Sequence, residues 1–512
     1  MLVKVYGASV QGLSAIPVTV EVNSSKGVKF YLVGLPDNAV KESHQRIMAA
    51  IENSGFCYPS RRFVVNLAPA DIRKEGAGFD LPIAVAILAT DGKVKADKLP
   101  RTMMVGELSL DGGLQPVKGV LPIAIKAREM GFEGLIVPEQ NVREAAVVNR
   151  LKVYGANHIC QVVRFLNGES ELEPTEIDTR AEFYAQQSQF DFDFADVKGQ
   201  ENVKRALEVA AAGGHNVIMI GPPGSGKSMM AKRLPSILPP LSLSESLETT
   251  QIHSVAGKLG RDSSLIAQRP FRAPHHTISQ IALVGGGSNP QPGEVSLAHN
   301  GVLFCDELPE FSRSVLEVLR QPLEDRQINI ARAKYSITYP CSFMFVASMN
   351  PCPCGYYNHP TKACVCTPGQ IHRYLHKISG PLLDRIDLQI EITPLSFEEL
   401  SRTAPGESSA TIRERVVRAR KVQEERYAGE NGVHCNAQMT PRLLREHAVL
   451  DERCTEMLRA AMTRLQLSAR AYDRILRVAR TIADLAGGGP IQLEHIAEAI
   501  GYRNLDRSNW GE

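Results

Sequence analysis

Apolar and polar positions divide the chain into four stretches. In residues 1–166, short β-rich runs such as 62–67 alternate with helical periods, which is typical of one α+β domain. Residues 167–189 are polar, acidic and poor in aliphatic side chains, as a linker would be. Across 190–396, helical patterns alternate with short apolar runs, which predicts an α/β core with a parallel sheet. The Arg-rich helical periodicity of 397–512 predicts a small helical domain.

Composition and charge narrow the class of protein. A chain of 512 residues is long enough for more than one buried core. Its 43% hydrophobic and 22% charged residues exclude a disordered or fibrous chain. The formal net charge of +2 shows no overall polybasic character. Any contact with nucleic acid must therefore come from a local patch.

Three features of the sequence bear on location. No apolar run approaches the roughly 20 residues that a membrane-spanning helix needs, so we expect no membrane segment. Residues 1–6 alternate like a strand and lack the pattern of a signal peptide. Of the ten cysteines, four fall between 352 and 366 and the others are scattered, unlike a disulfide framework. These features predict a cytoplasmic protein with a metal site.

Residues 221–228 match the phosphate-loop pattern between an apolar strand and a helical stretch. In this motif backbone N–H groups surround the phosphates, Lys227 reaches the β- and γ-phosphates, and Ser228 can ligate magnesium. The alternative is a glycine-rich turn that matches by chance. We expect ATP and Mg²⁺ to bind here. The nucleotide-binding residues expected are Gly221, Pro222, Pro223, Gly224, Ser225, Gly226, Lys227, Ser228 and Asp306.

Two later strands end in groups suited to hydrolysis. The apolar run 302–305 leads into Asp306, which can hold magnesium, and Glu307, which can polarise the attacking water. Capping of a following helix is the alternative role for this acidic pair. The run 343–347 leads to Asn350 at the carboxyl edge of the sheet, where an amide could orient the water. A turn residue is the alternative there.

The four clustered cysteines form two C-x-C pairs. Four thiolates on two tight turns can enclose Zn²⁺ tetrahedrally, which predicts a structural site that staples a loop. Free or redox-active thiols are the alternative, and His359 could replace one thiol. The expected zinc ligands are Cys352, Cys354, Cys364 and Cys366.

Together these motifs resemble AAA+ ATPases, in the branch of magnesium chelatase, the MCM helicases and the bacterial ComM/YifB proteins. The string Asn-Pro-Cys-Pro-Cys-Gly at 350–355 resembles the ComM/YifB group in particular. The resemblance implies a hexameric ring in which Arg385 completes the neighbouring site and Arg470 of the helical lid senses nucleotide. Arg474 and Arg477 lie on nearby helix faces as alternatives to Arg470.

The first 166 residues contain strings at 66–71, 74–80, 105–111 and 116–119 that resemble the proteolytic domain of Lon, a ribosomal S5 domain 2-like fold. A Ser-Lys peptidase needs a hydroxyl nucleophile and a lysine base. The matching positions here are Ala77 and Leu121, so we expect an inactive domain. Lys118 and Lys126 flank the second position as surface charges.

The resemblance also implies a substrate. A β-hairpin is expected at 327–337, with Arg332 and Lys334 near its tip, and in this branch such a hairpin points into the ring channel. Two cations per subunit would form a collar that tracks DNA phosphates, although solubilising charges are the plainer role. The segment 269–276 is a second candidate for the DNA path, and the N-terminal domain is a third. The implied function is a hexameric DNA helicase that drives branch migration and integration of transforming DNA by homologous recombination. The alternative is a chelatase-type subunit that remodels a protein partner.

Overall fold

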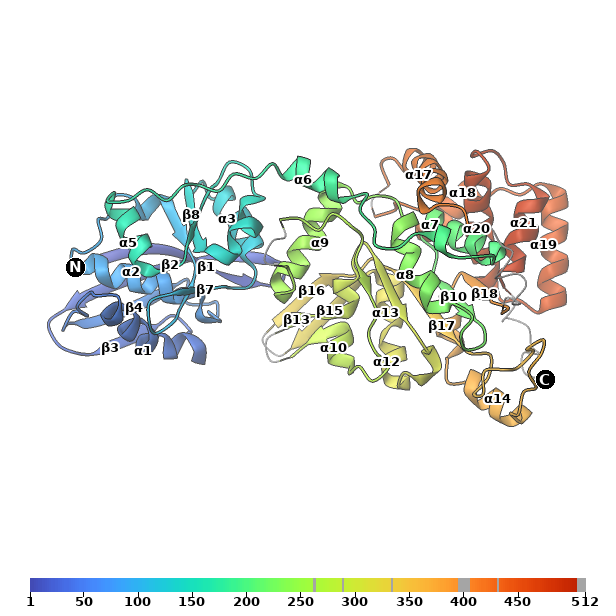
Figure 1. The fold of residues 1–512 in the computed structure, drawn as a ribbon, viewed down its shortest axis with the longest axis horizontal. Helices are drawn as coiled ribbons and strands as arrows, with labels where there is room; N and C mark the ends of the chain where they lie inside the picture. The colour runs from blue at the N-terminus through green and yellow to red at the C-terminus, as the bar shows by residue number, and fades with distance from the viewer. Residues whose placement is uncertain (261–263, 288–289, 333–334, 395–405, 431, 504–512) are drawn as a thin grey trace. The chain divides into compact units, whose positions relative to one another are not determined.

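Figure 1 shows the computed structural model, which describes residues 1–260, 264–287, 290–332, 335–394, 406–430 and 432–503. These residues form two compact units. Unit 1 consists of Met1–Gln186 and Leu243–Ala267, and unit 2 of Gln187–Ser242 and the chain from Gln268 onward. The division departs from the expected boundaries, because most of the expected linker and a segment between the phosphate loop and the acidic strand belong to unit 1.

Unit 1 is built on a mixed seven-stranded sheet of order β3-β4-β2-β1-β5-β8-β9. Along β2, Val18, Val20 and Val22 are fully buried and alternate with more exposed residues, because successive side chains point to opposite faces of a strand. The elements of unit 1 are β1 (Leu2–Gln11), β2 (Ser14–Ser25), β3 (Phe30–Val33), α1 (Asn38–Asn53), β4 (Arg62–Ala68), α2 (Asp80–Thr90), β5 (Thr102–Met104), β6 (Glu107–Leu108), β7 (Leu114–Gln115), α3 (Val120–Glu129), β8 (Gly134–Pro138), α4 (Val142–Ala146), β9 (Lys152–Ala156), α5 (Ile159–Asn167), α6 (Thr179–Gln186) and α9 (Leu243–Ala256).

Helix α9 joins unit 1 through specific contacts. It packs on α3, and the backbone N–H of Gly119 donates to the carbonyl oxygen of Ser254 at 3.1 Å. Farther along, the Ser264 hydroxyl donates to Glu182 at 2.9 Å. The chain therefore passes between the two units at three points, after residues 186, 242 and 267.

Unit 2 contains a parallel sheet of order β11-β14-β17-β10-β18. Because β17 lies between β14 and β10, the loops that follow these three strands meet at one edge. This confirms the expected α/β class and all three predicted strands. The elements are α7 (Glu201–Gly213), β10 (Val217–Ile220), α8 (Lys227–Ile237), β11 (Phe271–Arg272), α10 (Gln280–Val284), β12 (Gly285–Gly286), β13 (Gln291–Pro292), α11 (Glu294–Leu297), β14 (Val302–Cys305), α12 (Arg313–Val318), α13 (Arg320–Asp325), β15 (Gln327–Arg332), β16 (Tyr335–Pro340), β17 (Met344–Met349), α14 (Pro368–Leu375), α15 (Gly380–Leu383), β18 (Leu388–Glu391), α17 (Ser409–Arg426), α18 (Pro441–His447), α19 (Glu452–Leu465), α20 (Ala469–Leu485) and α21 (Leu493–Gly501).

The C-terminal helices share one hydrophobic core with this sheet. Ile475 and Ile482 of α20 belong to the same buried cluster as Val217 of β10. Polar bonds add to the packing: His215, just before β10, contacts the Thr481 hydroxyl through Nε2 at 2.8 Å. Among the described residues, no helix has both the length and the apolar composition to cross a membrane.

Candidate functional site

The phosphate loop begins where β10 ends. All four residues of β10 are buried, which fixes the start of the loop at the edge of the sheet. The loop ends at Gly226, whose φ of 89° lies in the left-handed region that favours glycine. Helix α8 starts at the next residue, and among the residues that the structure describes no side chain caps its N-terminus. Its first N–H groups are therefore available to an anion.

Lys227 is folded back into the loop. Its Nζ donates to the carbonyl oxygens of Gly221 at 2.7 Å and Pro222 at 2.9 Å, and to Oδ1 of Asn350 at 3.2 Å. Burial lowers the pKa of Lys227, and the carboxylates of Asp306 and Glu307 act in the opposite direction. The ammonium thus holds three oxygen partners that phosphate oxygens can replace.

The Asp306 carboxylate accepts hydrogen bonds from two hydroxyls that come from other segments at this edge of the sheet. The Ser228 hydroxyl donates to its Oδ2 at 2.7 Å, and the Ser348 hydroxyl donates to its Oδ1. Ser228 and Asp306, expected from the sequence to share magnesium, do lie side by side. Their hydroxyl and carboxylate oxygens are hard ligands that suit Mg²⁺. Sequence reasoning missed Ser348, although it lies on the strand that leads to Asn350.

Glu307 stands apart from Asp306 in exposure. Its backbone is left-handed, with φ of 53°, and 60% of its side chain is exposed. Neither of its oxygens caps the short helix that follows, at Leu308–Glu310, which removes the capping alternative for this residue. Nδ1 of His276 lies 3.7 Å from Oε2 of Glu307. His276 was expected only as part of a segment on the DNA path, so its position beside Glu307 is new.

Helix α14 contacts the backbone of Asn350 through Tyr374. The backbone of Asn350 bonds to the Tyr374 hydroxyl, and burial raises the pKa of that phenol while this bond opposes the shift. The Asn350 side chain points to Lys227, as described above. Three of the predicted groups, Lys227, Asp306 and Asn350, therefore meet at the carboxyl edge, and Glu307 lies next to them in the chain.

The predicted arginines lie elsewhere in unit 2. Arg385 is buried, and its guanidinium donates to Glu324 and to the carbonyl oxygen of Pro381. Arg470 is 67% exposed and contacts Asp384 at 3.2 Å. Arg470 and Arg385 thus occupy neighbouring positions through Asp384, and both roles stay predictions.

The two alternatives to Arg470 have structural partners. Arg474 pairs with Asp387, which His215 also approaches through Nδ1 at 3.5 Å. Burial alone would raise the pKa of Asp387, but these two partners hold it well below its usual range. Arg477 donates to the carbonyl oxygen of Met439 at 2.8 Å. Of these arginines, Arg470 is the one that faces solvent.

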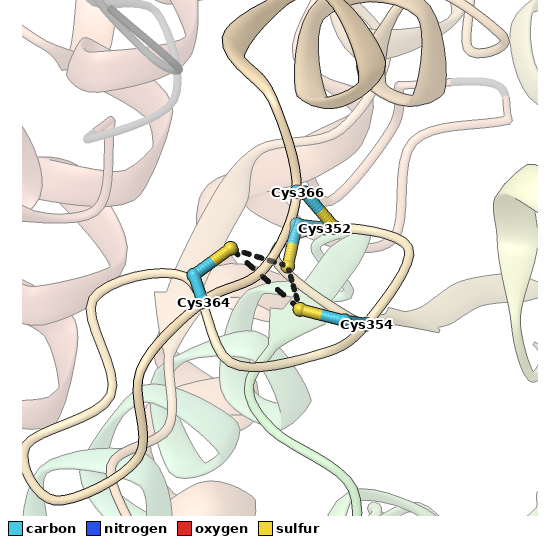
Figure 2. Close-up of side chains that lie close together, drawn as sticks. All are labelled: Cys352, Cys354, Cys364 and Cys366. Atoms are coloured by element: carbon cyan, nitrogen blue, oxygen red, sulfur yellow. Dashed lines mark hydrogen bonds between the residues drawn. The ribbon is translucent and has the colours of Figure 1, made fainter.

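The four clustered cysteines converge (Figure 2). Their sulfur atoms all lie within 4.8 Å of one another. Sγ of Cys364 is 3.7 Å from that of Cys352 and 3.6 Å from that of Cys354, and the Cys352 and Cys354 sulfurs are 3.3 Å apart. A tetrahedral Zn–S bond of about 2.3 Å implies sulfur separations of about 3.8 Å, so the cluster fits zinc. His359 is outside the cluster, and its Nδ1 accepts from Thr361 at 3.2 Å.

The loop that carries the four cysteines, residues 352–366, lies directly against the phosphate loop. A Cβ added at Gly355 would lie 2.5 Å from Cδ of Pro223, and the φ of Gly355 is +84°. Glycine is therefore required there by both conformation and space. A metal that orders the cysteine loop would brace the loop that holds phosphate and the strand end that carries Asn350.

The proposed DNA residues are only partly visible. The expected hairpin forms from β15 and β16, which pair from Gln327↔Pro340 to Arg332↔Tyr335. The side chain of Arg332 and all of Lys334 lie outside what the structure describes. In the second candidate segment, Arg269 donates to Asn300 at 2.8 Å and Arg272 is paired with Glu294 at 2.6 Å. These internal bonds make that segment the weaker candidate.

The Lon-like positions in unit 1 hold no catalytic groups. Ala77 lies in a short 3₁₀ turn, and Leu121 is fully buried in the first turn of α3. Lys126 pairs with Glu129 at 3.1 Å, as expected of a surface charge. Neither position offers a nucleophile or a base.

Comparisons with known proteins place these features in context. Residues 193–400 match the family described as magnesium chelatase, subunit ChlI; residues 20–141 and 406–503 match two further ChlI families, the latter C-terminal. The chain is 46% identical to "Competence protein ComM" of Haemophilus influenzae, covering 98% of this chain and 97% of that protein. It is 45% identical to "Uncharacterized protein YifB" of Escherichia coli, covering 97% and 96%. "Lon protease 2" of Bacillus subtilis is 34% identical over 28% of this chain and 27% of its own length.

Proposed function

We propose that this chain, which belongs to the ComM/YifB family, is an ATP-driven motor that acts on DNA as a hexameric ring. The observation that carries the proposal is the meeting of Lys227, Asp306 and Asn350 at the carboxyl edge of the unit 2 sheet. Phosphate-binding, magnesium-binding and water-orienting groups occupy one edge, as ATP hydrolysis requires.

Each group has a role that its contacts support. Lys227 exchanges loop carbonyls for β- and γ-phosphate oxygens, and Ser228 and Asp306 are the residues that would hold Mg²⁺. Bound Mg²⁺ neutralises charge on the phosphates. Glu307, exposed at the edge, takes a proton from the attacking water, and Asn350 orients that water. The reaction is hydrolysis of the γ-phosphate of ATP.

The ring proposal assigns Arg385 to the neighbouring subunit's site and a nucleotide-sensing role to Arg470. Mixing Arg385→Ala subunits with Glu307→Gln subunits should restore hydrolysis, because the intact Arg385 of one subunit then faces the intact site of its neighbour. Mixing Lys227→Ala with Glu307→Gln subunits is the matched control and should restore none, because both changes disable a subunit's own nucleotide site. A monodisperse monomer with full ATPase activity would contradict the ring.

The name of the Haemophilus relative supports a DNA substrate in competence, so we propose branch migration that integrates transforming DNA by homologous recombination in the cytoplasm. Arg332 and Lys334 would form the channel collar. Changing both to Ala should weaken DNA binding with little dependence on sequence and flatten its salt dependence. Junction unwinding at the wild-type rate by this variant would exclude the collar.

The cysteine cluster is proposed to bind one Zn²⁺ as a structural site. Zinc should copurify at about one ion per chain, and Cys352→Ser with Cys364→Ser should release it, because binding and local folding are linked. Because Gly355 contacts Pro223, ATPase activity should also fall. The scattered Cys57, exposed and outside the cluster, is the control when changed to Ser. Zinc-free protein from an anaerobic preparation would leave free thiols as the answer.

The second candidate function is a chelatase-type remodelling subunit, which the magnesium chelatase families favour by name. ATPase assays with single-stranded, duplex and forked DNA separate the two. The motor proposal expects stimulation by DNA. Hydrolysis that no DNA affects, but that a protein partner stimulates, would favour remodelling.

A further inference from the structure

A group of four exposed cations lies at one end of the unit 1 sheet. Lys26 and Lys29 are on the connection from β2 to β3, and Arg61 and Arg62 are at the start of β4. All four are exposed, and none of their side chains forms a hydrogen bond or ion pair with another residue in the described part of the chain. The sequence has no Asp or Glu in 22–36 or 53–70, so no carboxylate is close to these cations along the chain.

The sheet register brings these cations together. Ser25 pairs with Arg62, and the N–H of Phe63 donates to the carbonyl oxygen of Lys29 at 2.8 Å. A Cβ added at Gly27 would lie 3.2 Å from Cβ of Arg62, so the connection lies directly against β4. Glu21, an acidic residue on the same face, is already paired with Lys4 at 3.0 Å.

An aromatic ring lies within this cluster. Tyr31 on the edge strand β3 is 41% exposed, and the guanidinium of Arg62 lies 5.0 Å from the centre of its ring. Tyr31 pairs with Val64, and residues two apart on a strand share a face, so Tyr31 and Arg62 present one outward surface. The other face of β4, with Phe63, Val65 and Leu67, is buried. Strand β3 is at the edge of the sheet (Figure 1).

We propose that Lys26, Lys29, Arg61, Arg62 and Tyr31 form a binding site for single-stranded DNA on unit 1, separate from the channel collar. The cations contact backbone phosphates and Tyr31 stacks on an unpaired base, which is the combination that single-strand binders use. A duplex could use only the cations, because its bases are already stacked. The site rests on the proposed DNA function and gives the Lon-like domain a role that needs no catalytic dyad.

The test compares two charge-matched double variants of the full-length protein in binding to labelled single strands over a salt series. Lys29→Ala with Arg62→Ala should weaken binding and lower the salt slope by up to about 1.4, at about 0.7 for each phosphate that the variant no longer neutralises. Arg150→Ala with Lys152→Ala, exposed cations at the opposite edge of the same sheet, should change neither. Tyr31→Ala should weaken single-strand binding about tenfold and spare duplex binding, and Tyr31→Phe should keep it.

Basal ATPase activity without DNA should be unchanged in all these variants, which serves as the folding control. If the wild-type protein binds no DNA, the proposed function itself fails. If it binds DNA and Lys29→Ala with Arg62→Ala binds with the same affinity and salt slope, this site is overturned while the motor proposal stands. If binding is unchanged but the oligomeric state shifts, the surface is an interface between copies of the chain. Equal losses on single strands and duplex with no effect of Tyr31→Ala would overturn base stacking.

Discussion

Two helices of this protein begin in the same way and differ in what contacts their first N–H groups. Helix α8 in unit 2 and helix α3 in unit 1 each follow a glycine in the left-handed region, Gly226 with φ of 89° and Gly119 with φ of 72°. Each therefore points unpaired N–H groups away from its first turn. At α8 no side chain in the described part of the chain bonds to those groups, and a lysine lies first in the helix.

At α3 a side chain of the protein, Glu144, occupies the position where an anion would bind. The backbone N–H of Leu121 donates to Oε1 of Glu144 at 3.0 Å, and the Ser254 hydroxyl of α9 donates to the same oxygen. Asn141 donates to the other oxygen at 3.2 Å. A helix N-terminus becomes a ligand site only where the fold leaves it without an internal acceptor. The Lon-like start of α3 is closed in this respect, while the start of α8 is open.

The largest expected effect is the loss of ATP binding when the lysine at the start of α8 is removed. Lys227→Ala should abolish ATP binding, because the first turn then lacks the charge that reaches the β- and γ-phosphates. Binding of a fluorescent ATP analogue measures this. Leu121→Lys, which places a lysine near the start of α3, is the counterpart and should add no nucleotide binding, because Glu144 already occupies that N-terminus. ATP affinity of Lys227→Ala equal to wild type would refute the assignment of the loop.

Weakening the internal acceptor at α3 has a smaller effect, on stability. Glu144→Gln should destabilise α3 by about 1–3 kcal/mol near pH 4.5, because its amide turns a donor toward donor groups. Burial raises the pKa of Glu144, although its hydrogen bonds oppose this. A carboxyl with a raised folded-state pKa stabilises most below its unfolded pKa, so this contribution is lost as pH rises from about 4.5.

Hydrogen exchange at the Leu121 amide across this pH range measures both effects. The cost of Glu144→Gln should shrink as pH rises. A cost that stays constant from pH 4 to 8 would show that the Glu144 carboxyl has the same pKa folded and unfolded.

The smallest expected effect comes from changing His276, which lies outside the phosphate loop. This change tests whether ATP hydrolysis depends on the contact between His276 and Glu307. His276→Gln should lower kcat for ATP about fivefold with KM unchanged, because Glu307 loses a neighbour that orients it, worth about 1 kcal/mol. His275→Gln is the matched control, since its Nδ1 contacts the Thr277 hydroxyl at 2.9 Å instead. If both variants lose activity equally, the loss comes from a general disturbance of the segment 269–276, and the contact between His276 and Glu307 does not contribute.

Features that depend on neighbouring residues in the chain could be predicted from the sequence, and contacts between distant residues could not. The family resemblance is confirmed, as are the sheet class and the strands around residues 217–220, 302–305 and 344–349, because local patterns specify them. Contacts between distant segments escaped: Ser348 with Asp306, and His276 with Glu307. The placement of 243–267 in unit 1 also depends on packing that no local pattern shows.

The central claim is that ATP hydrolysis at α8 moves DNA strands. Its most direct test is strand exchange of a labelled three-strand junction by wild-type and Glu307→Gln protein, with ATP present or withheld. We expect wild-type protein to resolve the junction only with ATP. Glu307→Gln should bind ATP and the junction yet leave the strands in place. Strand exchange by Glu307→Gln at the wild-type rate, or wild-type protein that hydrolyses ATP without moving any strand, would contradict the claim.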